Sequence, residues 1–143
     1  MSGCNSLNET LEFIKYSMEY EFQTFLIMPP AYYKGNTDKG VFDFYSKLIK
    51  ALPKMKIILY NFEKLSGYKF SAEAVTKLVK NFPNNIIGCK DSSYNLFEKL
   101  KLPNFLMFPG SEAKLLKGLE LGCSGCISAV TNVTHSLARK VFD

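Results

Sequence analysis

Short, continuously apolar runs recur along the chain, and each is followed by a stretch with the periodicity of a helix. Five of these runs are expected to be strands, at residues 25–28, 56–61, 85–90, 105–108 and 125–130. Strands that are apolar throughout, rather than at alternate positions, are typical of parallel sheets covered by helices in βαβ units. The pattern therefore predicts an α/β protein with a parallel sheet.

The helices between these runs are indicated by caps and apolar stripes. Ser6 and Glu9 have the spacing of a capping box, which predicts a helix from residue 7. Further helices are expected over residues 41–52, 71–82 and around 96–102, and then after the caps Ser111 and Asn132. Two architectures fit, a doubly wound sheet of five strands or part of a (β/α)8 barrel. Both place function at the carboxyl ends of the strands.

The composition limits the class of protein. At 143 residues, with 47% hydrophobic and 22% charged residues, the chain can form one domain with a core. The net charge of +5 comes from scattered lysines, with Arg139 the only arginine, which does not favour nucleic-acid binding. No apolar stretch could span a membrane, and the N-terminus has no signal-peptide pattern. We therefore expect a cytoplasmic protein with no membrane partner.

The sequence indicates neither a metal site nor a nucleotide cofactor. No Gly-x-Gly-x-x-Gly motif and no P-loop follows an expected strand. Cys123 and Cys126 form a single CxxC pair and His135 is the only histidine, so a structural zinc site lacks its second pair of ligands. Cys89 and Cys126 lie in apolar runs, where a thiol behaves as a small hydrophobe. All the cysteines are expected to be structural.

Two reactive side chains end neighbouring strands. Lys90 closes the run of residues 86–89, and Tyr60 follows residues 57–59. Burial disfavours a charged amine, and the free amine is the form that attacks a carbonyl. Parallel strands ending in these residues can present an amine and a phenol at one mouth. The alternative, in which Lys90 extends to solvent and Tyr60 belongs to the core, remains open on these grounds.

The polar strand ends as a set resemble one family. They are Pro30-Ala31-Tyr32-Tyr33-Lys34-Gly35, Leu59-Tyr60-Asn61 with Leu65-Ser66-Gly67, Gly88-Cys89-Lys90-Asp91-Ser92-Ser93, Pro109-Gly110-Ser111-Glu112 and Gly125-Cys126-Ile127-Ser128. At this spacing the chain resembles the dihydrodipicolinate synthase / N-acetylneuraminate lyase family of class I aldolases, over essentially all of its length. The Tyr-Asn strand end followed by Gly-x-Lys-Asp-Ser-Ser is the specific part of the resemblance.

The resemblance implies a (β/α)8 TIM barrel of roughly twice this length. Residues 3–6 would match the loop after the third strand, so residues 1–143 would form a single incomplete barrel domain with strands four to eight. The first three strands, the carboxylate-binding loop after the second strand and the C-terminal helices would be missing. The family also implies a homo-oligomer, a tetramer at full length.

By the same resemblance, Lys90 would form a Schiff base with the keto carbon of pyruvate or another 2-oxo acid, and Tyr60 would relay a proton. Tyr33 would reach into a neighbouring subunit's site, although local packing of a loop aromatic is an open alternative. Gly110, Glu112 and Ile127 would lie around the substrate. For Glu112 the alternative is an acid that favours the first turn of a helix. No cofactor is implied.

One departure from the family narrows the substrate. Leu65 stands where the synthase branch has an arginine that recognises the carboxylate of the aldehyde partner, and an aliphatic side chain cannot make that forked contact. The resemblance is therefore closer to the sialic-acid lyases and sugar-acid aldolases, so we expect cleavage or formation of a carbon–carbon bond in a sugar-derived 2-oxo acid. Glu63, where proline is usual, is a second departure.

Three hypotheses follow from the sequence. The chain is an aldolase that is active once the missing strands are supplied, with 4-hydroxy-tetrahydrodipicolinate synthase as the alternative reaction. It is a non-catalytic fragment or binding remnant, because an open piece of a barrel exposes two strand edges. Or it is a free-standing doubly wound binding domain.

Overall fold

A parallel sheet organises the protein, whose computed structural model describes residues 4–32 and 34–143. Among these residues the sheet has four strands in the order β1-β2-β3-β4. Their bounds are β1 Thr24–Ile27, β2 Lys56–Asn61, β3 Ile86–Asp91 and β4 Leu106–Pro109. All three strand pairs are parallel, as the apolar runs predict. Strand order follows chain order, which is the arrangement in a (β/α)8 barrel.

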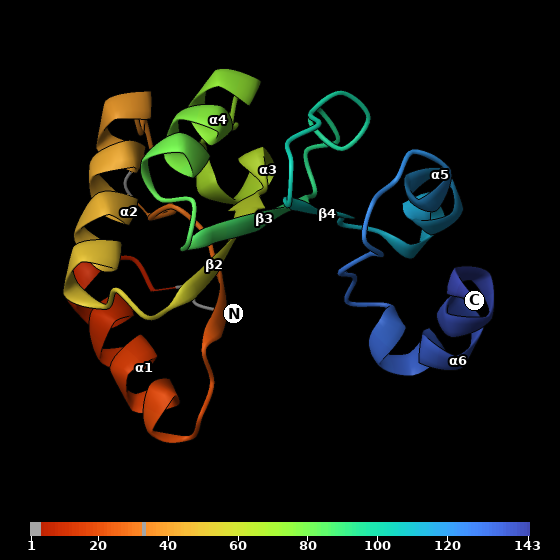
Figure 1. The fold of residues 1–143 in the computed structure, drawn as a ribbon, viewed down its shortest axis with the longest axis horizontal. Helices are drawn as coiled ribbons and strands as arrows, with labels where there is room; N and C mark the ends of the chain where they lie inside the picture. The colour runs from red at the N-terminus through yellow and green to blue at the C-terminus, as the bar shows by residue number, and fades with distance from the viewer. Residues whose placement is uncertain (1–3, 33) are drawn as a thin grey trace.

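Helices connect the strands and lie mostly on one side of the sheet. They are α1 Leu7–Glu19, α2 Asp38–Ala51, α3 Glu63–Ser66, α4 Ala72–Asn81, the 3-10 helix η1 Glu112–Lys114, α5 Leu115–Glu120 and α6 Thr131–Phe142. Figure 1 shows α1, α2 and α4 together beside the sheet, whereas α5 and α6 lie beyond β4. None of the described helices is long and apolar enough to cross a membrane.

The caps explain where several helices begin. The Ser6 hydroxyl accepts from the backbone N–H of Glu9, as the capping box predicts. Thr37 caps α2 by accepting from Gly40, so this helix starts three residues before the expected residue 41. Ser111 caps the 3-10 turn that leads into α5. Asn132 is not a cap, because α6 begins at Thr131 and Asn132 lies in its first turn.

The two faces of the sheet differ in burial. Ile27, Leu59 and Cys89 are register partners in successive strands, and each is fully buried beneath the helices. On the other face Leu26 and Ile58 are partners and only half-buried, and Leu106 is 40% exposed. In a closed barrel this second face points inward. The helix-covered face therefore holds the core, and the inward face is left partly open.

Residues 125–130 are not a strand, which corrects the fifth strand expected from the sequence. The segment runs beside β4 with two backbone hydrogen bonds, from Ser124 N–H to the Met107 carbonyl at 2.9 Å and from Ile127 N–H to Pro109 at 3.2 Å. Gly125 between them has φ 136°, which no extended strand residue adopts. The positive φ interrupts the ladder, so the segment stays irregular.

The helix expected around residues 96–102 is also absent from the described chain. One turn forms there, closed by Leu100 N–H to the Leu96 carbonyl at 2.7 Å. The N–H groups of Leu96 and Phe97 bind the side chain of Asp91, at 2.8 and 2.9 Å. The buried carboxylate thus caps the start of this turn, which does not continue into a helix.

Candidate active site

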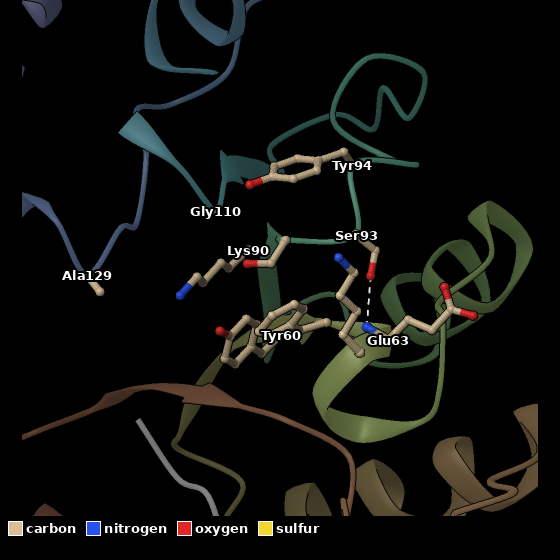
Figure 2. Close-up of a pocket in the computed structure, with 10 residues that line it drawn as sticks. Tyr60, Glu63, Lys90, Ser93, Tyr94, Gly110 and Ala129 are labelled. Atoms are coloured by element: carbon tan, nitrogen blue, oxygen red, sulfur yellow. Dashed lines mark hydrogen bonds between the residues drawn. The ribbon is translucent and has the colours of Figure 1, made fainter. Parts of the chain in front are cut away.

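Lys90 and Tyr60 lie side by side at the carboxyl ends of β3 and β2. They are register partners in the parallel pair, so their side chains leave the same face of the sheet. The Lys90 Nζ lies 4.2 Å from the centre of the Tyr60 ring. Both are buried, with 8% of Lys90 and 7% of Tyr60 exposed. The amine and the phenol that the sequence singled out are thus brought together (Figure 2).

A pocket of about 470 Å³ opens above this pair. Its lining residues come from the ends of the strands and the loops that follow them. They are Tyr60, Phe62, Glu63, Lys64, Lys90, Ser92, Ser93, Tyr94, Gly110 and Ala129. A concave site with convergent polar groups at the carboxyl end of a parallel sheet is where α/β proteins bind small molecules.

The next residue of each strand anchors the site from the opposite face. Asn61 and Asp91 are register partners, fully buried, and the Asn61 Nδ2 donates to the Asp91 Oδ1 at 2.8 Å. The other carboxylate oxygen accepts from the backbone N–H groups of residues 96 and 97, and Oδ1 accepts from Ser93 N–H at 3.2 Å. A buried carboxylate with this many donors is well satisfied, and it holds the loop after β3 against β2.

Asn61 extends this network to a second loop. Its Nδ2 also donates to the Asn95 Oδ1 at 2.8 Å, and its Oδ1 accepts from Phe70 N–H at 3.1 Å. Asn95 in turn donates to the Phe70 carbonyl at 2.9 Å. Sequence reasoning gave Asn61 and Asp91 no role of their own. Their position in the sequence could have indicated a structural role, because each comes one residue after Tyr60 or Lys90 and the strand pleat turns it toward the core.

Gly110 forms part of the pocket wall, at a point where a larger residue would clash with Ser92. A Cβ at this position would lie 2.0 Å from the Ser92 Oγ and 2.8 Å from its Cβ. The Gly110 N–H donates to the Asp91 carbonyl at 3.0 Å, which draws the loop after β4 onto the end of β3. The structure therefore places this predicted substrate-binding residue in the pocket wall.

Glu112 lies just beyond β4 and is bound by serine hydroxyls. Ser128 donates to its Oε2 at 2.6 Å, and Ser111 is 3.5 Å from the same atom. The hydrogen bond from Ser128 is the largest cause of a lowered pKa for the Glu112 carboxyl, followed by its own backbone N–H. The carboxylate is held ionised and ties residue 128 to the start of η1.

The remaining predicted site residues lie farther from the pair. Leu65 is on α3 with half of its surface exposed, and Ile127 bonds to Pro109 beside β4. Neither Leu65 nor Ile127 is among the described residues that line the pocket. Tyr33 lies outside the described residues. Substrate-binding roles for Leu65 and Ile127, and the relay role of Tyr33, stay predictions.

Within the part of the chain that the structure describes, the cysteines and acids are not gathered as a metal centre. Across residues 4–32 and 34–143 no group of three or more His, Cys, Asp or Glu side chains is placed to hold a metal ion. Cys89 is fully buried, and burial with the nearby Asp91 carboxylate raises the pKa of its thiol. Burial likewise raises the pKa of Cys123. Thiols held protonated in this way are poor nucleophiles and poor metal ligands.

A four-stranded parallel sheet whose strands follow chain order, with a pocket at their carboxyl ends, is the arrangement of part of a (β/α)8 barrel. The model of the dihydrodipicolinate synthetase family matches residues 1–143, and the chain belongs to that family. The sequence prediction of the family and of an α/β partial barrel is confirmed.

Several lyases, aldolases and synthases from other organisms resemble the chain. The 2-dehydro-3-deoxy-D-gluconate/2-dehydro-3-deoxy-phosphogluconate aldolase of Picrophilus torridus is 31% identical over 142 residues, 96% of this chain and 52% of that protein. The 4-hydroxy-tetrahydrodipicolinate synthase of Thermus thermophilus is 32% identical over 92% of this chain and 45% of its own length. The N-acetylneuraminate lyase of Clostridium perfringens is 28% identical over 99% and 49%.

Solved structures give the same relation. DHDPS from Cyanidioschyzon merolae superposes with a TM-score of 0.84 at 27% identity, covering 95% of this chain and 47% of that one. The 2-keto 3-deoxygluconate aldolase of Picrophilus torridus gives 0.81 at 28%, covering 96% and 55%. The chain spans about half the length of the relatives that it matches.

Proposed function

We propose that the pocket is the active site of a Schiff-base aldolase or lyase that makes or breaks a carbon–carbon bond in a 2-oxo acid. The observation that carries the proposal is the contact between Lys90 and Tyr60, with the amine 4.2 Å from the ring centre at the buried floor of a pocket. Membership of a family whose relatives bear lyase and aldolase names supports it.

In this reaction the Lys90 amine attacks the keto carbon, and with the uptake of one proton the carbonyl oxygen leaves as water. The resulting iminium carries a positive charge that accepts the electron pair of the breaking bond beside it. Tyr60, whose ring lies against the amine, moves the proton at the reacting oxygen. The enamine left on Lys90 then takes up a proton at its carbon, and hydrolysis of the iminium so formed releases pyruvate and restores the Lys90 amine.

The proposed machinery also needs Tyr33, which lies outside the described residues, and the three barrel strands that residues 1–143 do not include. Tyr33 would extend the proton relay into a neighbouring subunit, so the working enzyme would be a homo-oligomer, a tetramer at full length. The missing strands would supply the loop that binds the substrate carboxylate. On this proposal residues 1–143 are one incomplete domain, and catalysis takes place in the cytoplasm without a cofactor.

A sugar-derived 2-oxo acid is the proposed substrate. Leu65 cannot make the forked contact by which an arginine at this place binds the second carboxylate in the synthase branch. Gly110, Glu112 and Ile127 would surround the sugar chain. The Glu112 carboxylate would accept hydrogen bonds from the sugar hydroxyls in place of the one that Ser128 donates to it. The names of the Picrophilus torridus and Clostridium perfringens relatives include sugar-acid substrates of this kind.

A second candidate is a non-catalytic fragment of such an enzyme. Within the described residues β1 pairs only with β2, and the inward face of the sheet is half-exposed, as in an unclosed barrel. The 4-hydroxy-tetrahydrodipicolinate synthase reaction, which the Thermus thermophilus relative carries in its name, is the alternative activity.

Release of pyruvate tests these candidates. The chain is incubated with 2-dehydro-3-deoxygluconate or with N-acetylneuraminate, and pyruvate is measured with a coupled dehydrogenase. We expect release that is lost in Lys90→Ala. A folded chain that releases no pyruvate from either compound favours the fragment, and condensation of pyruvate with aspartate semialdehyde as the sole activity favours the synthase.

A further inference from the structure

The pocket contains a second cation besides Lys90. Lys64, on α3, lines the same pocket and is exposed. Glu63 is the acidic residue among the described lining residues, and its carboxylate binds Lys69 at 2.8 Å. Figure 2 shows the Glu63 carboxylate directed away from Lys90. Among the ion pairs of the described chain Lys64 has none, so its charge is available to a ligand.

A hydroxyl donor lies at the same side of the pocket. The Ser93 Oγ accepts from the backbone N–H of Glu63 at 2.9 Å, which fixes its position against the start of α3 (Figure 2). A hydroxyl that accepts one hydrogen bond keeps its own proton to donate. Ser93 and Lys64 thus offer a neutral donor and a charged donor to the pocket. Ser93 comes from the loop after β3 and Lys64 from α3, whereas the strand ends hold the reacting pair.

Tyr94 forms the wall opposite Tyr60. Its φ of 56° is in the left-handed region, which a tyrosine adopts only when its surroundings hold it there. The ring packs edge-on against Phe97, with 6.2 Å between centroids, and the Lys114 Nζ lies 5.9 Å from its centre. In Figure 2 the ring lies across the pocket from Tyr60. Tyr94 therefore forms one wall of the pocket that Lys90, Lys64 and Ser93 also line.

We infer that Lys64 and Ser93 form a subsite for a second anionic group of the substrate, a phosphate or a carboxylate at the end remote from the 2-oxo group. The inference rests on the proposed function, because that function places the 2-oxo end at Lys90. Lysine binds phosphate and carboxylate as a point charge, and a hydroxyl adds a directed hydrogen bond. Lys64 is then a specificity-determining residue that separates substrates with a charged far end from substrates with a neutral one.

Three compounds that cannot form an imine test the subsite by itself. Gluconate has a neutral far end, whereas 6-phosphogluconate and glucarate carry a phosphate and a carboxylate there. Their affinities for the chain are measured by calorimetry, with Lys64→Met as the variant and Lys64→Arg as the conservative replacement. Lys54→Met, in the exposed turn before β2 at the other end of the sheet, is the matched control with the same change in charge.

We expect at least one of the charged compounds to bind the parent chain about tenfold more tightly than gluconate does. Lys64→Met should abolish the difference, while Lys64→Arg and Lys54→Met should keep it. A preference for 6-phosphogluconate alone assigns a phosphate, and a preference for both assigns any terminal anion. Equal binding of all three compounds by the parent, or an unchanged preference in Lys64→Met, overturns the subsite.

The same preparations separate this inference from the proposed function. Borohydride reduction in the presence of pyruvate reports the imine at Lys90, and pyruvate has no far end for Lys64 to bind. Lys64→Met should therefore trap pyruvate as the parent does. Loss of trapping in the parent contradicts the proposed aldolase and leaves the anion measurement to decide the subsite on its own.

Discussion

On two neighbouring strands, consecutive residues point to opposite faces of the sheet and serve different purposes. Tyr60 and Lys90 leave the inward face and meet at the pocket, while Asn61 and Asp91 leave the other face and meet beneath the helices. The buried carboxylate is satisfied by a side-chain amide and three backbone N–H groups. Each reactive side chain is thus one residue away from an anchor, which limits how far the pair can shift.

Removal of the Tyr60 hydroxyl should separate proton transfer from imine formation. Tyr60→Phe keeps the ring beside Lys90 and its stack on Phe62, so the fold should be unchanged. Turnover should fall by roughly two to four orders of magnitude, the usual contribution of a positioned acid or base. Tyr16→Phe, on the exposed face of α1, is the control and should not change the rate. Equal turnover in Tyr60→Phe and the parent would remove Tyr60 from the mechanism.

The lowered pKa of Glu112 predicts a local dependence on pH. This carboxylate contributes to folding above its ordinary pKa of 4.5, and the contribution disappears as the pH falls through the lowered value. An NMR titration should give Glu112 a midpoint below 4.5 in the parent chain and a higher one in Ser128→Ala, because the Ser128 hydroxyl is the main cause of the shift. The same midpoint in both proteins contradicts the assignment.

At the scale of elements, the apolar runs predicted the sheet well because strands that are apolar on both faces leave a simple pattern in the sequence. β2 has the bounds expected from the sequence, and β1, β3 and β4 differ by a residue or so. The misses lie where tertiary contacts override local pattern. Residues 96–102 read as a helix but form only one turn, which the Asp91 carboxylate holds, and residues 125–130 read as a strand but contain a glycine with positive φ.

The site was predictable only in part. The lysine and tyrosine stood out because a charged or phenolic group at the end of an apolar run is unusual. The contributions of Lys64, Ser93 and Tyr94 depend on how two loops fold over the strand ends, and no local pattern encodes that. Contacts of this kind are determined by the network around Asn61 and Asp91, whose partners are up to 34 residues apart in sequence.

The packing of two loops at the strand ends depends on Gly110. Gly110→Ala should destabilise the fold by roughly 1–3 kcal/mol, because the new methyl group would overlap Ser92 and force the loops apart. Gly40→Ala is the matched control: in α2 a Cβ would lie 3.4 Å from the Thr37 Oγ1, and alanine is favoured in a helix by about 0.5–1 kcal/mol. Denaturant unfolding of both variants measures the difference, and equal stability would show that the loops yield freely.

At the scale of the whole molecule, the open sheet determines behaviour in solution. Within the described residues β1 has one neighbour, and the inward face exposes apolar side chains. Exposed apolar residues also lie on α6, where no residue is buried: Val133, Leu137, Val141 and Phe142. Unpaired strand edges and apolar patches both favour association.

The chain alone should therefore be oligomeric or poorly soluble. Light scattering after size exclusion should detect species larger than a monomer, and addition of a segment with three further βα units and C-terminal helices should give a defined, tetrameric enzyme. A monodisperse monomer of 143 residues that unfolds cooperatively would favour a self-contained binding domain instead.

The central claim is that Lys90 forms an imine with a 2-oxo acid, and covalent trapping tests it most directly. The folded chain is treated with pyruvate and borohydride, digested, and each lysine peptide is examined by mass spectrometry. We predict one adduct, at Lys90, which is absent from an equally folded Lys90→Ala. No adduct on the folded parent, or an adduct spread over exposed lysines such as Lys54 and Lys64, would contradict the account.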